Sequence, residues 1–365
     1  MMKIDLTNVS RHAKALALFL FAPLMSQAQT ASSFYQPGVT TEGAVYFLPK
    51  TAVRVTIQVE KTTYTPGDFC KYAERYLRVK GVSPTPSVSY RITTIRQEAV
   101  AVADTSKRYA VEFNAKTSAS NVNLSSDGIL LSINTDPVRR PGAKPFTPAP
   151  RPAAVNPRQY MSEEILAAGS TAKMAELTAQ DIYEIRESRN LLVRGQADNM
   201  PKDGEQLRLM LSQLDLQDRS MTSLFTGITT KDTTEHTLTV VPDREVNREL
   251  LFRFSSKLGI VDDDDLSGVP YYISIENLKT VPEAEPTDPK KKLKQVPGIY
   301  VNVPGKMRSR VSNASETLIS SEFAAGQFGN VELLSGALFN KRYTTHLWLD
   351  PLSGAIEKLD AEQPK

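Results

Sequence analysis

The sequence predicts an α+β fold with two mostly antiparallel β domains, a helical pair at the start of the second, and a Pro-rich linker between them. Three observations predict it: short runs of alternating apolar and polar residues, a proline-rich interruption, and apolar residues at helical spacing directly after it. The 365 residues divide into a signal peptide at 1–28, a β-rich domain with one short helix at 29–136, a linker at 137–157, and a helical pair followed by a β-rich domain at 158–365. Two domains suit this length, because single cores seldom grow past roughly 250–300 residues.

The N-terminus has the layout of a secretory signal peptide. Three basic residues precede a short apolar stretch, Ala15 to Leu24, which Ser26-Gln27-Ala28 follows. We expect cleavage after Ala28. The apolar stretch is too short to span a bilayer, so an uncleaved anchor is the less favoured alternative, and no later stretch approaches the 18 or so apolar residues of a spanning helix.

Charge and cysteine content exclude several classes. The chain has 44 Lys and Arg against 41 Asp and Glu, and part of the small basic excess lies in the leader. This balance gives no bulk field for nucleic acid. The single cysteine, Cys70, cannot form an internal disulfide framework. We expect it to be a buried thiol on an apolar stripe, with a disulfide to another chain as the alternative.

The first domain begins with a clear strand signal. Val53, Val55, Ile57 and Val59 alternate with polar residues, which predicts a strand with one buried face. Pro66-Gly67 ends this strand, and helical spacing then predicts a short helix over 69–77. Further strands are expected at 88–94, 98–103, 109–113, 122–124 and 129–133.

The linker, residues 137–157, contains seven prolines and few side chains that could build a core. This composition predicts an extended, semi-rigid segment. A ligand for an aromatic groove is the less favoured interpretation.

The second domain opens with two expected helices. Thr178 is the expected cap of the first, and Asp203 with Gln206 forms a capping box for the second. The apolar stripe predicted for the second helix consists of Leu207, Met210, Leu211 and Leu214. The helices should form an antiparallel pair joined around Gly195 to Pro201. Strands are then expected at 238–241, 250–254, 271–275, 299–303, 317–323 and 343–349, with a long exposed loop at 281–298.

Common catalytic motifs are scarce. Only His236 and His346 follow the leader, and a Ser-His-Asp or Cys-His mechanism needs an imidazole beside its nucleophile. Ser170 and Lys173 match the S-x-x-K pattern of acyl transfer, but an ordinary helix start explains the pair better. No motif predicts a cofactor, and we lean against an enzyme.

Two charge clusters suggest weaker ligand sites. In the run 262–265, Asp262 and Asp264 are candidates for a divalent cation, although a solvated turn is the favoured interpretation. A lysine cluster in the long loop could support peripheral association with an anionic envelope surface, against a mixed-charge solvated loop. Its members are Lys290, Lys291, Lys292 and Lys294.

One helical face is a candidate for partner docking. Glu184, Arg186 and Arg189 share a helix with Glu187, and opposite charges three or four residues apart can brace such a face. The favoured interpretation is that ion pairs hold the helical pair against the second β domain; the alternative is a docking surface.

Several segments together resemble a known family. They are Tyr46-Phe-Leu-Pro-Lys-Thr51, Tyr64-Thr-Pro-Gly-Asp68, Tyr72-Ala-Glu-Arg-Tyr-Leu77, Ile182-Tyr-Glu-Ile-Arg-Glu-Ser-Arg189, Pro201-Lys-Asp-Gly204 and Phe252-Arg-Phe-Ser255. The set resembles an uncharacterised domain-of-unknown-function family of secreted envelope proteins from bacteria of the Bacteroides group. The resemblance implies a Gram-negative envelope, hence the periplasm or the outer surface, and it brings no activity or site residue.

The leading functional hypothesis is therefore a non-enzymatic envelope scaffold or protein-binding module with an envelope protein as its partner. One alternative is a hydrolase or glycan-processing enzyme whose carboxylate pair sequence cannot locate. Another is a carbohydrate- or ion-binding protein with a shallow aromatic site, for which Tyr271, Tyr272 and Trp348 are candidates.

Overall fold

The computed structural model describes residues 31–34, 43–112, 121–140, 142, 145–150, 155–201, 203–282, 298–339 and 344–362. The predicted signal peptide and the lysine cluster at 290–294 lie outside these residues. Strand is the prevailing structure, all named strands pair antiparallel, and helices are few, which confirms the α+β class. None of the helices described is both long and apolar enough to cross a membrane.

The strands form three sheets. The first has the order β1-β3-β2-β6, the second β11-β10-β9-β7-β8 and the third β13-β12-β5-β4. The strands are β1 (Ala31–Phe34), β2 (Gly43–Thr65), β3 (Ser87–Glu112), β4 (Val122–Leu124), β5 (Leu130–Ile133), β6 (Ile228–Val240), β7 (Val246–Ser255), β8 (Gly259–Val261), β9 (Val269–Asn277), β10 (Gly298–Ser312), β11 (Thr317–Ser335), β12 (Thr344–Leu349) and β13 (Ile356–Glu362).

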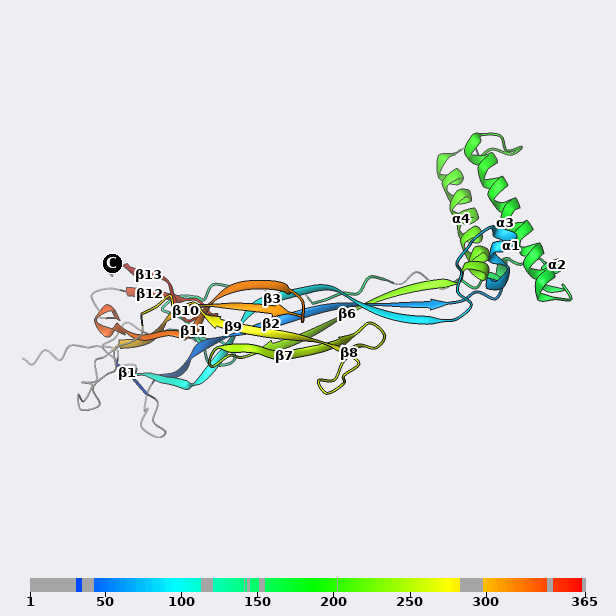
Figure 1. Ribbon diagram of the computed structural model, residues 1–365. Helices are drawn as coiled ribbons and strands as arrows, with labels where there is room; N and C mark the ends of the chain where they lie inside the picture. The colour runs from blue at the N-terminus through cyan, green and yellow to red at the C-terminus, as the bar shows by residue number, and fades with distance from the viewer. Residues whose placement is uncertain are drawn as a thin grey trace, which may run out of the picture.

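The helices gather at one end of an elongated molecule, and both β1 and the C-terminal β13 lie near the other end (Figure 1). We call the helical end the head, the opposite end around β12 and β13 the base, and the long sheets between them the stalk. The helical segments are η1 (Cys70–Tyr72), α1 (Ala73–Leu77), η2 (Pro157–Tyr160), α2 (Glu163–Leu166), α3 (Thr171–Arg194), α4 (Gly204–Thr226) and, in the base, η3 (Gly336–Phe339).

The stalk is built on the pairing of β2 with β3. The ladder runs from Gly43 opposite Glu112 to Tyr64 opposite Ser87. At about 3.3 Å per residue, the 23 residues of β2 extend roughly 75 Å. The predicted alternation is confirmed, because Val53, Val55, Ile57 and Val59 are buried and the residues between them are not.

Two cores lie along this ribbon and a third fills the head. In the stalk, the valines of β2 pack against the second sheet through Phe252, Ile273, Ile275, Met307 and Val311. The base core collects Tyr46, Leu48, Tyr109, Val111, Leu130, Ile133, Ile299, Val301, Phe339, Leu347 and Leu349. The head core joins α1, α2, α3 and α4 through Phe69, Ala73, Leu77, Met161, Ile165, Ala175, Ala179, Ile182, Met221, Leu224 and Phe225.

The sheets do not follow the predicted division at residues 137–157. β6, from beyond the linker, pairs with β2 from Val53–Val240 to Thr65–Ile228, and β12 pairs with β5. Strands from 29–136 and 158–365 therefore share sheets and cores, and the strand pairing gives no support to two separate β domains. The predicted strands at 88–94 and 98–103, and residues 109–112 of the one predicted at 109–113, are parts of one long strand, β3.

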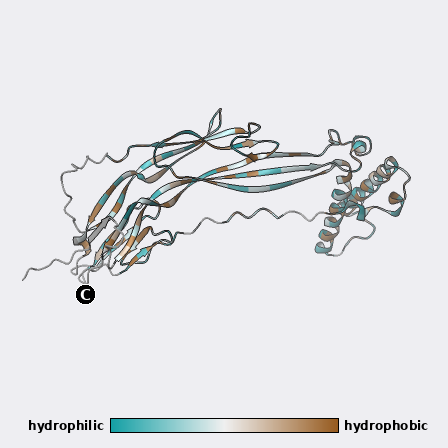
Figure 2. Cartoon of the chain, turned by 90° about the horizontal axis from the view of Figure 1, so that it is seen from below, coloured by the Kyte–Doolittle hydropathy of each residue, from teal (hydrophilic) through white to brown (hydrophobic). Residues whose placement is uncertain are grey.

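Figure 2 shows a long trace without helix or strand between the base and the head, and described residues at the two ends of the proline-rich segment have contacts at these two places. At the base, Arg140 contacts Asp350 at 3.0 Å and Glu357 at 3.4 Å. At the head, Arg158 contacts Asp68 at 3.3 Å. Its described residues before η2 form neither helix nor strand.

The helices begin at polar caps, although not everywhere at the predicted residue. Asp203 caps α4 by accepting a hydrogen bond from the Glu205 amide, as predicted for this residue. The cap of α3 is Ser170 and not Thr178. Thr178 is buried inside the helix, and its hydroxyl donates to the Met174 carbonyl at 2.7 Å, a bond that lets a threonine sit mid-helix.

Tyr109 is a buried residue of the base core. Its ring stacks on Tyr300, with ring centroids 4.3 Å apart. Burial raises the pKa of Tyr109 to about 12, with smaller contributions from Tyr300 and Asp104.

We predict that Tyr109 makes the fold sensitive to alkali. Between pH 10 and 12 the unfolded chain releases the phenol proton while the folded chain keeps it, so the free energy of unfolding falls as pH rises. Tyr109→Phe removes the phenol and should flatten this fall, measured by urea unfolding at pH 9 and pH 11.5. Exposed Tyr183→Phe is the control; an unchanged pH dependence in Tyr109→Phe would contradict the assignment.

Candidate functional site

The acidic run is a turn between β8 and β9. The Asp265 amide donates to the Asp262 carbonyl at 3.0 Å, and the Asp265 carboxylate accepts from the Ser267 amide at 2.8 Å. Arg253 Nε donates to the Asp263 carbonyl at 2.7 Å. No three His, Cys, Asp or Glu side chains come together as metal ligands anywhere in the described ranges, so nothing completes a site around Asp262 and Asp264.

The docking candidates lie on the seam between α3 and α4. Arg186 Nε lies 2.9 Å from Asp218 Oδ1, and Arg189 Nε lies 2.6 Å from Asp215 Oδ1. Glu184 is exposed on α3. The two arginines therefore tie one helix to the other, and not the helical pair to the second β domain as the favoured interpretation had it. The carboxylates that they contact lie on α4. The spacing of charges within α3 could not predict these ion pairs, because their partners belong to another helix.

The S-x-x-K match marks the start of α3. Ser170 Oγ accepts from the Lys173 amide at 3.3 Å, as an N-cap does. The Lys173 ammonium lies 3.2 Å from Glu176. Both groups are engaged in local helix contacts, in agreement with the ordinary helix-start interpretation.

The aromatic candidates are covered by neighbouring side chains. Tyr271 stacks on Phe252, with ring centroids 4.5 Å apart. Arg248 lies 4.9 Å from the ring centroid of Tyr272, and Lys358 lies 4.8 Å from that of Trp348. These are cross-strand or near-strand contacts, so the three rings form no common exposed platform.

Cys70 differs from its prediction. It lies in η1 and is partly exposed, not buried. It is not among the buried residues of the head core, where Phe69 and Ala73 beside it take the buried places.

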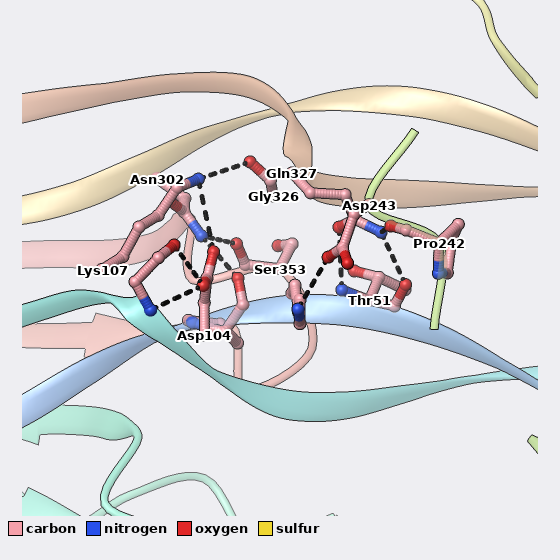
Figure 3. A network of polar contacts seen from close by, with 12 residues as sticks. Thr51, Asp104, Lys107, Pro242, Asp243, Asn302, Gly326, Gln327 and Ser353 are labelled. Atoms are coloured by element: carbon pink, nitrogen blue, oxygen red, sulfur yellow. Dashed lines mark hydrogen bonds and ion pairs between the residues drawn. The ribbon is translucent and has the colours of Figure 1, made fainter. Parts of the chain in front are cut away.

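A polar joint connects the base core to the stalk core (Figure 3). Gln327 of β11 holds the backbone of Thr51 in β2: its Oε1 accepts from the Thr51 amide at 2.9 Å and its Nε2 donates to the Thr51 carbonyl at 2.8 Å. Nε2 also donates to the Pro242 carbonyl, just past the end of β6. The Gln327 side chain thus takes the place of a strand partner for the amide and carbonyl of Thr51, where β6 no longer pairs with β2.

Asn302 is the buried centre of this joint. It is 1% exposed, and its Nδ2 donates to the Pro49 carbonyl at 2.9 Å and to the Ser353 carbonyl at 2.8 Å. Nearby, the Lys107 ammonium lies 3.3 Å from the Gly326 carbonyl and 4.0 Å from Asp104. Burial lowers the pKa of Lys107, and Asp104 opposes that effect. The joint fastens β2, β10, β11 and the β12–β13 turn to one another, which is a structural role.

A polar hollow of about 840 Å³ lies where Pro145, Phe146 and Thr147 pass over the outer face of the first sheet. Its carboxylates are engaged by arginines: Glu98 lies 3.2 Å from Arg54, and Glu235 lies 3.5 Å from Arg96. The hollow therefore offers charge-balanced pairs and not two free facing carboxylates.

The head carries a groove of different character. It measures about 550 Å³ and lies between the far halves of α3 and α4 and their connection. Its lining is Ser188, Leu191, Leu192, Ala197, Asp198, Asn199, Leu209, Met210, Gln213, Leu214 and Gln217. Leu209 is 60% exposed and Met210 is 38% exposed, so large apolar side chains reach solvent here. An apolar groove between helices is a common kind of binding site.

Part of this site was visible in the sequence. Met210 and Leu214 belong to the predicted apolar stripe of α4, but Leu209 and Leu216 lie off it. A helix with apolar residues on more than one face is a signal of a second covered surface. The sequence alone did not show that Ser188, Leu191 and Leu192 of α3 also line the groove, because this depends on how α3 packs against α4.

The fold and groove define a class: an elongated β-rich protein with a helical head. A family-model comparison matches residues 42–357 to "Domain of unknown function (DUF4831)". The chain belongs to this family, which confirms the expected membership of a family of unknown function. A search of the curated proteins and a search of the solved structures each gave no match.

We predict that Asn302→Ala destabilises the fold by about 2 kcal/mol or more, because two buried carbonyls lose their donor and an unsatisfied buried group costs ~1–3 kcal/mol. The measurement is urea unfolding at neutral pH. Asn302→Asp, which keeps the shape but removes the donor, should be at least as damaging. The exposed Asn247→Ala is the control, and a stability loss no larger than the control's would show that the joint is dispensable.

Proposed function

We propose that this protein is an exported, non-enzymatic component of a Gram-negative cell envelope, in the periplasm or on the outer surface, where it acts as a scaffold or protein-binding module. The signal-like N-terminus supports export. The segments that resemble secreted envelope proteins of the Bacteroides group support the compartment. The proposed role is to hold the head at a fixed distance from the base and to present it to an envelope protein.

The observation that carries this proposal is the separation of the apolar head groove from both described chain ends. The groove lies at the far end of α3 and α4, whereas β1 and β13 lie near the base (Figure 1). Between them, β2 and β3 form a ladder interrupted only by register shifts at Phe47/Pro49 and Gln58/Val59. A tether at the base would leave the head free to meet a partner.

The stalk is suited to act as a spacer. Strand β2 connects each core to the next. Strand β6 pairs with the head-side part of β2, from Val53 to Thr65, and so adds a second ladder there. At the head, the ladder passes into the helices through close backbone contacts: the Phe69 amide donates to the Leu224 carbonyl at 2.7 Å. A Cβ at Gly67 would meet that same carbonyl at 2.1 Å, so the approach requires glycine.

The alternatives have less support. A hydrolase needs two carboxylates that face the same space, and Glu98 and Glu235 in the polar hollow each contact an arginine. A carbohydrate site needs an exposed aromatic face, and Tyr272 and Trp348 lie under cationic side chains.

We predict that the head is the end that meets the partner. A photo-crosslinking amino acid is placed at Leu209 in the head, at Thr237 in the stalk or at Ile356 in the base, in the native host. Leu209 should give one defined cross-linked envelope protein by mass spectrometry, in a membrane or periplasmic fraction, and Thr237 should give none. Cross-links from Ile356 alone, or a cytoplasmic fraction, would contradict the proposal.

A further inference from the structure

We propose that the head groove binds an amphipathic helix of a partner protein, with a leucine-type apolar face and a basic end that lies against Glu184 and Glu187. This inference rests on the proposed function and names the chemistry of the partner that the head would meet. Helix-in-groove recognition of this kind reads apolar anchors at i, i+3, i+4 and i+7.

The apolar stripe of α4 is covered in one half and open in the other. Met210, Leu214, Gln217, Met221 and Leu224 follow one another at alternating steps of four and three, so they share one helix face. Near the stalk, Met221 is 1% exposed and Leu224 is 5% exposed, whereas Met210 is 38% exposed. The stripe thus continues from the core into the groove.

The elements that cover the buried half are themselves short helices. η1, η2 and α1 all contact α4, and the head core takes Phe69 from just before η1 and Ala73 and Leu77 from α1. Further out, α3 and α4 contact each other, but of the residues of α3 beyond Ile182 only Leu192 is buried. One more helix laid along this half would continue the packing already present near the stalk.

The charges beside the groove select a basic partner. Glu184 lies one turn before Ser188, and Glu187 one turn before Leu191, so both exposed carboxylates share the α3 face that lines the groove. Asp181, one turn further, faces the same acidic surroundings: burial, Glu184 and Glu164 raise its pKa.

Basic side chains on the seam do not offset these carboxylates. Arg186 and Arg189 contact Asp218 and Asp215 on α4. At the other end of the groove, Asp198 lies close in sequence to the exposed Arg194. The side chains beside the groove therefore carry net negative charge at its stalk-side end and almost no net charge at its tip. This arrangement places the basic end of the partner helix toward the stalk.

The same charges disfavour a second copy of this chain as the occupant. An isologous contact through the groove would bring Glu184 and Glu187 close to their own counterparts, or to the tip, where Asp198 offsets the charge of Arg194. The groove side of α3 extends about 12 Å from Glu184 to Leu192, at 1.5 Å per residue. A partner helix of roughly three turns is therefore long enough to lie along it.

Two synthetic helical peptides of sixteen residues test the proposal. Both carry the same leucine stripe and a glutamine polar face, and they differ in one end, which carries three lysines or three glutamates. Fluorescence anisotropy with the full mature chain gives each Kd. The lysine peptide should bind at least tenfold more tightly than the glutamate peptide.

Variants locate the site. Leu209→Gln with Met210→Gln should weaken the lysine peptide at least tenfold, and Glu184→Gln with Glu187→Gln should bring the two peptides to within about threefold of each other. Leu266→Gln, at an 84% exposed leucine of the β8–β9 turn, is the matched control and should change neither Kd. Circular dichroism checks that each variant keeps its helices.

Equal affinity for the two peptides, no binding up to millimolar concentration, or insensitivity to the Leu209 and Met210 changes would overturn the proposal. A Leu209 cross-link to a second copy of the chain would overturn it too. A Leu209 cross-link to another envelope protein, together with no peptide binding, would overturn this inference but leave the proposed function standing.

Discussion

Strand β2 is the element on which the rest of the structure depends. Its first residues place Tyr46 and Leu48 in the base core, its middle places four β-branched side chains in the stalk core, and its end leads directly to Phe69 of the head core. Because side chains of a strand alternate between faces, a single strand can serve successive cores only if its register is fixed along the strand and shifts only at defined places, here Phe47/Pro49 and Gln58/Val59. The β3 ladder fixes that register.

The polar joint is needed because β2 contributes side chains to both the base core and the stalk core. Between Leu48 and Val53 the partners of β2 change, and the ladder with β3 shifts register between Phe47 and Pro49. The backbone groups exposed by this change would be costly if left unpaired. Gln327 both accepts from and donates to the backbone of Thr51, and Asn302 donates to the Pro49 carbonyl. Buried amides here are thus a requirement of the long strand and not a sign of catalysis.

The sequence supported local predictions better than long-range ones. The alternation of Val53 to Val59 and the helical pair were predictable, because periodicity depends on neighbouring residues. β6 was missed over most of its length, since its threonines and charges suit a strand with a largely exposed edge and leave no alternating apolar pattern. The pairing of β6 with β2 closes a loop of more than a hundred residues, which no local pattern encodes.

For the candidate site, the sequence identified the helices but not what their charges contact. The sequence places Arg186 and Arg189 on a charged helix face, but their partners Asp218 and Asp215 depend on how the two helices pack. The groove was equally out of reach, because it exists only where the α3 and α4 surfaces meet beyond the cover of α1 and η2.

Small-angle X-ray scattering of the mature chain tests the central claim that a stiff stalk keeps the head away from the base. The account predicts a skewed distance distribution with a maximum dimension beyond the roughly 75 Å of β2 alone. It also predicts a radius of gyration well above the ~20 Å expected for a compact chain of about 340 residues. A radius of gyration near that compact value, with a symmetric distance distribution, would show that the head folds back on the stalk and would contradict the spacer account.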